Sequence, residues 1–283
     1  MDFINNPPQI LISAGYILLY LVMFFFSKWL KGMFSTYNLD EQLTQYDNNA
    51  VSVSVAGYFI GVTTIFIGAI GGDSGQSVGM EFLTVTGYCL GGIFLLHLSR
   101  VINRKLILNK FSVDKEIIND QNAGTGVVEA ATYIASGLII AGSIYGEGGG
   151  PWVTLVFYAI GQVCMVLFSL LYVQLTPYSV HDEIEKDNTA AGLGFAGGLI
   201  SIGIIVMHAV SGVFNGWKED LISLGKDILI VFVYLIVVRI VFDRFVLRNS
   251  NLTTEIAKDR NIGAGLLEMI VAICFSAVLY FVI

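Results

Sequence analysis

Long apolar runs separated by polar segments dominate the pattern along the chain. At a rise of about 1.5 Å per residue, a run of about 20 residues crosses the roughly 30 Å of hydrocarbon in a bilayer. Runs of this kind cover residues 10–30, 50–70, 80–101, 123–145, 152–174, 190–211, 224–245 and 262–282. The pattern therefore predicts an all-α membrane protein with eight transmembrane helices.

Short and long polar connections alternate between these runs. The long connections share the pattern Glu-Ile-x-x-Asp, followed by small polar residues and then Ala or Gly. The copies are Glu116-Ile117-x-x-Asp120, Glu183-Ile184-x-x-Asp187 and Glu255-Ile256-x-x-Asp259, with a looser first copy from Gln42-Leu43 to Asp47. Because each copy opens an apolar run, the repeating unit is a helix hairpin of about 70 residues.

A second period relates the two halves of the chain. Shifted by 139 positions, residues 100–129 align with residues 239–268 without a gap. Identical pairs include Arg100/Arg239, Asn122/Asn261 and Glu129/Glu268. This predicts two tandem four-helix domains, 1–145 and 146–283. Since each has an even number of spans, the halves share one orientation, which favours a pseudo-twofold axis along the membrane normal.

Composition narrows the function classes. The chain is 55% hydrophobic and 13% charged, with a formal net charge of −7, which opposes nucleic-acid binding. Its cysteines and histidines lack ligand spacing, so neither a metal site nor a cofactor is expected. No pairing of a nucleophile with a base stands out, and the sequence predicts no enzyme.

The basic residues predict the topology. All fifteen Lys and Arg residues except Lys218 and Lys226 lie on the side of the repeated motif. The positive-inside rule places this side in the cytoplasm and both termini outside. The first apolar run lacks a basic leader and a cleavage site, so it is expected to remain as a helix.

The short Glu-Ile-x-x-Asp-x-Asn-x-Gly segment, opening a helix rich in small residues in a four-helix unit used twice, resembles the domain of unknown function 350 family. The resemblance covers nearly the whole chain as two copies. It implies a bacterial inner-membrane protein, and the family's association with membrane-stress genes suggests an envelope role. The family carries no established activity.

Glu129 and Glu268 are the main candidates for a functional site. Each lies seven residues after a motif asparagine, Asn122 or Asn261, about 10 Å along the helix. At the same depth, the other two hairpins carry Ala56 and Ala196, which predicts two Glu and two Ala alternating around a central axis.

These carboxylates have two interpretations, which are compatible. An ionisable group inside a membrane is costly and often serves function, which predicts a proton or cation site at these two residues. Alternatively, Arg100 and Arg239, at the same membrane face, form ion pairs with Glu129 and Glu268.

The motif itself also has two interpretations. Its Asp residues, with the Asn residues that follow them, are expected to cap the following helices. Alternatively, the four Asp residues form a carboxylate ring that gathers cations. The motif residues concerned are Asp47, Asn49, Asp120, Asp187, Asn188 and Asp259.

The sequence thus favours a channel or transporter for a small ion or polar solute. The alternative is a membrane scaffold that recruits a cytoplasmic protein in an envelope-stress response. Membrane lipids are expected partners. The sequence does not decide whether the protein forms a homo-oligomer.

Overall fold

The structure is a computed structural model that describes residues 8–72, 77–146, 149–241 and 251–283. These residues contain helices and no strand, as predicted. The long helices are α2 (Gln9–Phe34), α4 (Asn49–Ile70), α5 (Val78–Leu106), α7 (Ala123–Ile144), α8 (Gly150–Leu175), α10 (Thr189–Val210), α11 (Trp217–Val241) and α12 (Ile262–Val282). Short helices lie in the long connections: α3 (Leu39–Thr44), α6 (Val113–Ile118), α9 (Val180–Glu185) and the π-helical turn η2 (Thr254–Lys258).

Seven helices in the described part of the chain are long and apolar enough to cross a membrane. The exception among the long helices is α11, whose first turns carry Lys218, Glu219 and Asp220. The predicted eighth span, 224–245, runs past Val241 into residues outside the described ones, and it stays a prediction.

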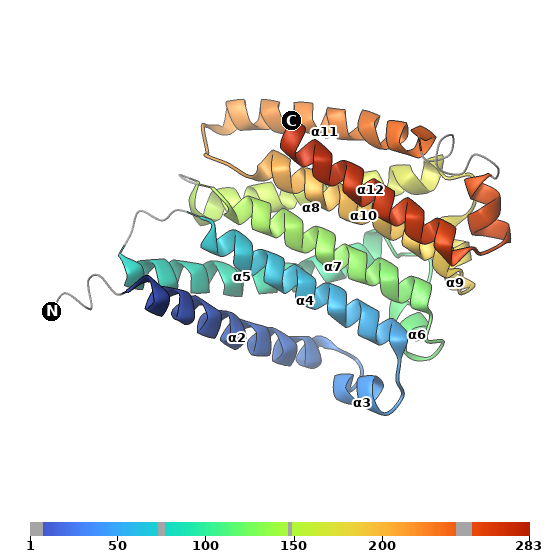
Figure 1. Cartoon of the computed structure of the whole chain (residues 1–283), viewed down its shortest axis with the longest axis horizontal. Coiled ribbons are helices and arrows are strands. Elements are labelled where there is room, and N and C mark those ends of the chain that lie inside the picture. The colour runs from blue at the N-terminus through green and yellow to red at the C-terminus, as the bar shows by residue number, and fades with distance from the viewer. Residues whose placement is uncertain (1–7, 73–76, 147–148, 242–250) are drawn as a thin grey trace.

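The helices that follow the four motifs form a row. Helix α7 packs between α4 and α10, and α10 packs between α7 and α12, while α2, α5, α8 and α11 flank the row (Figure 1). Helices α4 and α12 lie at its two ends. The expected arrangement of Glu129, Glu268, Ala56 and Ala196 around one central axis is therefore wrong. Helices α7 and α10 each have small residues on two opposite faces. Each of these helices therefore packs against a neighbour on both sides, and the four helices form a row and not a ring.

One close contact builds the row and is used three times. A glycine four residues after a motif asparagine lies on the backbone of the preceding repeat. The pairs are Gly126 on Ala50, Gly192 on Gly124 and Gly265 on Ala190. A Cβ atom at Gly126 would lie only 2.5 Å from the carbonyl oxygen of Ala50. These positions therefore require glycine, as expected where membrane helices pack backbone to backbone.

The outer faces of the row carry larger side chains. Ile67 on α4 stands where α7 has Ala141, and Phe281 on α12 stands where α7 has Gly142. Ile67 and Phe281 are 64% and 86% exposed. Terminal units of repeat proteins differ from internal ones in this way, and these faces of the row are suited to contact lipid.

Candidate functional site

Each helix of the row begins at a motif asparagine. The Oδ1 atom of each asparagine accepts a hydrogen bond from a backbone N–H three residues later. The pairs are Asn48–Val51 at 3.1 Å, Asn122–Thr125 at 2.9 Å, Asn188–Ala191 at 3.2 Å and Asn261–Ala264 at 3.2 Å. The caps are thus asparagines. The capping predicted for the Asn residues that follow the motif Asp is present, whereas the capping predicted for Asp47, Asp120, Asp187 and Asp259 themselves is wrong.

The backbone explains this error. The residue before each capping asparagine has a left-handed conformation: Asp47 (φ 48°), Gln121 (φ 49°), Asp187 (φ 61°) and Arg260 (φ 49°). Asp120 and Asp259 lie one residue before the left-handed position, whereas Asp47 and Asp187 occupy it. An alignment of the four motifs on their Asp residues therefore misplaces two motifs by one residue. Asn49 is the first residue of α4 and does not cap it.

The capping asparagines also join successive repeats. Each Nδ2 atom donates within its own motif, to Gln42, Glu116, Glu183 or Glu255, at 2.8–3.0 Å. It also donates to the next motif's isoleucine carbonyl: Asn48 to Ile117 at 2.9 Å, Asn122 to Ile184 at 2.7 Å and Asn188 to Ile256 at 2.8 Å. The motif therefore serves as a connector between repeats.

We expect Asn122→Ala to destabilise the protein more than Asn261→Ala does. Both changes remove a helix cap, which costs about 1 kcal/mol. Asn122 is 1% exposed and also donates to the Ile184 carbonyl, so its loss removes one more buried hydrogen bond, at a further cost of about 0.5–1.5 kcal/mol. Thermal unfolding in detergent measures the difference. Equal losses would show that the bond between repeats contributes no stability.

Glu129 lies in an ion-pair network on the motif side of the row. It is 1% exposed, and its Oε1 atom accepts hydrogen bonds from Arg104 Nε, at 2.7 Å, and Arg104 Nη2. Ser54 Oγ donates to Oε2 at 2.5 Å. The predicted contact with Arg100 is present at 3.8 Å, but Arg104, one turn further along α5, makes the closer pair.

Two further charges complete this network. Arg104 Nη1 lies 2.6 Å from Asp114 Oδ1. Lys31, at the end of α2, is 1% exposed, and its Nζ atom donates to Tyr133 OH at 3.0 Å. We call Lys31, Arg100, Arg104, Asp114 and Glu129 the charge cluster. By formal charge it has one more cation than anion. Sequence reasoning missed Lys31 because a lysine at a helix end ordinarily reaches the headgroups.

Glu268 has different surroundings. It lies at the α10–α12 interface, where Tyr172 OH donates to its Oε1 atom at 3.5 Å. Gly194 stands where the first half has Ser54, and Tyr172 stands where it has Lys31. The side chain of Arg239 lies outside the described ones. Because Glu129 lies at the α4–α7 interface, the α7–α10 interface separates the two carboxylates, and they do not share one site.

A stripe of buried polar side chains runs along the seam between α5, α7 and α8. On α8 it contains Thr154, Tyr158 and Gln162, which are 9%, 5% and 3% exposed and four residues apart. Its other members are Ser99 and Asn103 on α5 and Ser136 and Ser143 on α7, all of them buried. Residues four apart share one helix face, so each helix turns one polar stripe toward this seam. We call these residues the polar file.

Hydrogen bonds link the file across the seam. Ser99 Oγ and Tyr158 OH lie 2.9 Å apart. One turn further, Gln162 Nε2 donates to Asn103 Oδ1 at 2.5 Å, and Asn103 Nδ2 donates to Ser136 Oγ at 3.1 Å. Gln162 Oε1 is buried and accepts no hydrogen bond from the described residues. Such a buried acceptor is costly unless it binds something.

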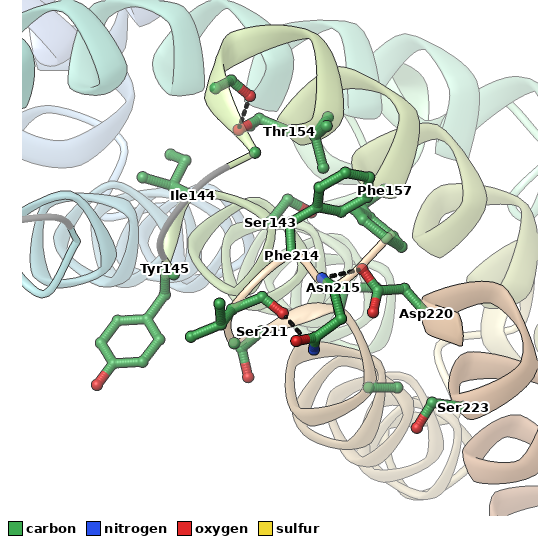
Figure 2. A pocket seen from close by; sticks show the side chains of 18 of the residues that line it. Ser143, Ile144, Tyr145, Thr154, Phe157, Ser211, Phe214, Asn215, Asp220 and Ser223 are labelled. Atoms are coloured by element: carbon green, nitrogen blue, oxygen red, sulfur yellow. Dashed lines mark hydrogen bonds between the residues drawn. The ribbon is translucent and has the colours of Figure 1, made fainter. Parts of the chain in front are cut away.

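At the end opposite the motifs, the file opens into a cavity of about 250 Å³. We call this cavity the outer pocket, for its position opposite the motifs. Figure 2 shows Ser143 and Thr154 lining this outer pocket together with Asp220 and Ser223 from the start of α11. The Asp220 carboxylate accepts a hydrogen bond from the Asn215 backbone N–H at 3.3 Å. At the other end, Tyr133 lies one turn from Ser136 on α7 and bonds Lys31. The file thus connects the outer pocket with the charge cluster.

Within the part of the chain that the structure describes, no group of three or more His, Cys, Asp or Glu residues is placed to hold a metal ion. The described cysteines are free, and Cys89 is buried.

Repeated helix hairpins, apolar spans and a motif at one end define a multi-pass membrane protein of the tandem-repeat class. The family model of the Domain of Unknown Function 350 (DUF350) matches residues 7–144 and again residues 149–283, and the chain belongs to this family. It is also 23% identical over 233 residues to the UPF0719 transmembrane protein of Aquifex aeolicus (strain VF5), covering 81% of this chain and 84% of that protein. No solved structure matches.

Proposed function

We propose that this protein carries a small polar solute or anion across the membrane, along the polar file. The observation that carries the proposal is the run of buried polar groups from the outer pocket, past Tyr158 and Gln162, to the charge cluster. In an apolar span such groups are costly to bury, and a continuous row of them is the kind of lining that a solute pathway needs. Successive polar side chains of the file on one helix lie one helical turn apart, about 5 Å. A small hydrogen-bonding solute or a water molecule can bridge this distance.

Charge decides between solutes. The charge cluster stands at the motif end of the file, and its two carboxylates are matched by Arg104 and Arg100, which leaves Lys31 in excess. When Lys31 is protonated, this excess in a low-dielectric region repels cations and protons. The file itself offers neutral hydroxyl and amide groups, which suit an anion or an uncharged solute. This replaces the cation or proton site predicted from Glu129 and Glu268.

Flux in proteoliposomes tests the proposal. The purified chain should conduct chloride, or admit small polyols measured by light scattering, and should conduct K⁺ and H⁺ poorly. Vesicles without protein give the background. Protein vesicles that match this background for anions and polyols would refute transport through the file.

A scaffold is the second candidate, and one observation favours it. The tips of the four motifs lie in a row at one face of the molecule, and each carries an exposed carboxylate: Asp47, Asp120, Asp187 and Asp259. Basic residues stand among these carboxylates, for example Lys115 at 3.4 Å from Asp120, so this row suits a partner protein with a matching pattern of both charges. If flux is absent, substitution of these residues becomes the relevant test.

The proposed orientation places the motifs in the cytoplasm of a bacterium and both termini outside, with α11 as the eighth span. In a cysteine-free background, Gln121→Cys lies at an exposed motif tip, and Val213→Cys, 58% exposed, lies at the opposite end. A membrane-impermeant thiol reagent should label Val213→Cys in intact spheroplasts and Gln121→Cys only after lysis. The reverse pattern would invert the topology.

A further inference from the structure

An apolar groove lies between α5 and α8, beside the outer pocket. Its volume is about 590 Å³, within the range of small-molecule sites. Gly87 and Gly91 form part of its floor, and a Cβ atom at either would meet nothing within 4 Å. Leu95 on α5 and Leu155 on α8 contribute apolar walls. A chain-like apolar group can therefore lie against the α5 backbone here.

The groove and the outer pocket adjoin each other. Tyr88, Ile144 and Thr154 line both of them. One end of the combined space is apolar, and the other is lined by hydroxyl groups, backbone groups and the Asp220 carboxylate. A ligand that fills both must therefore be amphiphilic.

The position of this space matches the layers of a membrane. The outer pocket lies where α7 and α10 end and where α8 and α11 begin. Exposed aromatic side chains mark the same level, namely Tyr145, Trp152 and Trp217, which are 46%, 69% and 41% exposed. Tyr and Trp concentrate at the headgroup level. The groove extends from this level toward the membrane interior.

We propose that the outer pocket and groove bind a membrane lipid whose headgroup carries a protonated amine. The acyl chain lies over Gly87 and Gly91, and the headgroup enters the pocket, where Asp220 faces the ammonium group. Asp220 is the one charged side chain among the described residues lining the pocket, so an amine headgroup is favoured over a purely anionic one. The outer pocket is also the outer end of the polar file, but the lipid assignment does not require that the protein transports a solute.

Lipid selectivity tests this assignment. The full chain is reconstituted in phosphatidylcholine vesicles containing either phosphatidylethanolamine or phosphatidylglycerol, spin-labelled at the same acyl carbon. The motionally restricted fraction of the label measures bound lipid. Wild type should retain phosphatidylethanolamine over phosphatidylglycerol by about tenfold, the effect of one charge-assisted contact.

Two variants and a control separate the parts of the site. Asp220→Asn should abolish the preference while chain binding persists. Gly91→Leu fills the groove and should remove the bound fraction of both lipids. Gly225→Leu, at an open glycine on α11, should match wild type. No headgroup preference in wild type, or a Gly91→Leu protein that binds like wild type, would overturn the proposal. Because the readout is bound lipid, these results do not depend on whether the protein transports anything.

Discussion

Replacing Glu129 by Gln should lower the free energy of unfolding by about 3–5 kcal/mol, the cost of leaving a buried charge unpaired. The change leaves Arg104 and Arg100 paired only with Asp114, and it removes the buried carboxylate that faces Lys31. Glu268→Gln is the matched control, since Glu268 is partly exposed and has different neighbours. Its loss should be clearly smaller. Urea unfolding in mild detergent measures both.

A double-mutant cycle identifies the cause. Arg104→Gln combined with Glu129→Gln should be more stable than Glu129→Gln alone, because the second change removes the buried cation that has lost its closest carboxylate. If the double variant loses the sum of the two single losses, Arg104 and Glu129 are not energetically coupled and the close pair contributes nothing specific.

Gln162→Leu should reduce solute flux by about tenfold or more. The side chain lies at the motif end of the polar file, and its Oε1 atom is an acceptor that the described residues leave unused. Losing one hydrogen bond to a passing solute raises the barrier by about 1.5 kcal/mol, which is about tenfold in rate. Flux in proteoliposomes, normalised to folded protein, measures the effect.

Val163→Leu is the control for this variant, because Val163 is next in sequence but 57% exposed toward lipid. Ser136→Ala gives a milder test, since it removes one hydroxyl from the file and leaves the Gln162–Asn103 bond in place. Flux that is unchanged in Gln162→Leu would exclude the file as the route.

Much of the fold was predictable from the sequence because apolar length and motif repetition are local signals. They predict the helices from Gln9 to Val282 and the hairpin repeats. The row was not predictable in the same way. Gly126 and Gly124 lie on opposite faces of α7, and only the packing shows that both faces are occupied.

The candidate site was predicted less well. Identity between the halves drew attention to Arg100 and Arg239, whereas Arg104, which has no arginine at the matching position, makes the close pair. Lys31 and Gln162 come from helices far apart in the chain, so no local pattern joins them. The spacing of Thr154, Tyr158 and Gln162 along one face of an apolar span was the available signal.

The connector between repeats has a consequence for biosynthesis. The side chain of Asn48 finds its acceptor on Ile117, and that of Asn188 finds its own on Ile256, in each case one repeat later in the chain. In a hairpin that has just left the ribosome, the asparagine side-chain amide therefore lacks this acceptor until the next hairpin emerges. We expect the protein to mature from the N-terminus onward. In a nascent chain halted before Ile184, the Asn122 side-chain amide should lack its acceptor in the next motif. The motif around Asn122 should then be sensitive to protease until translation supplies Ile184.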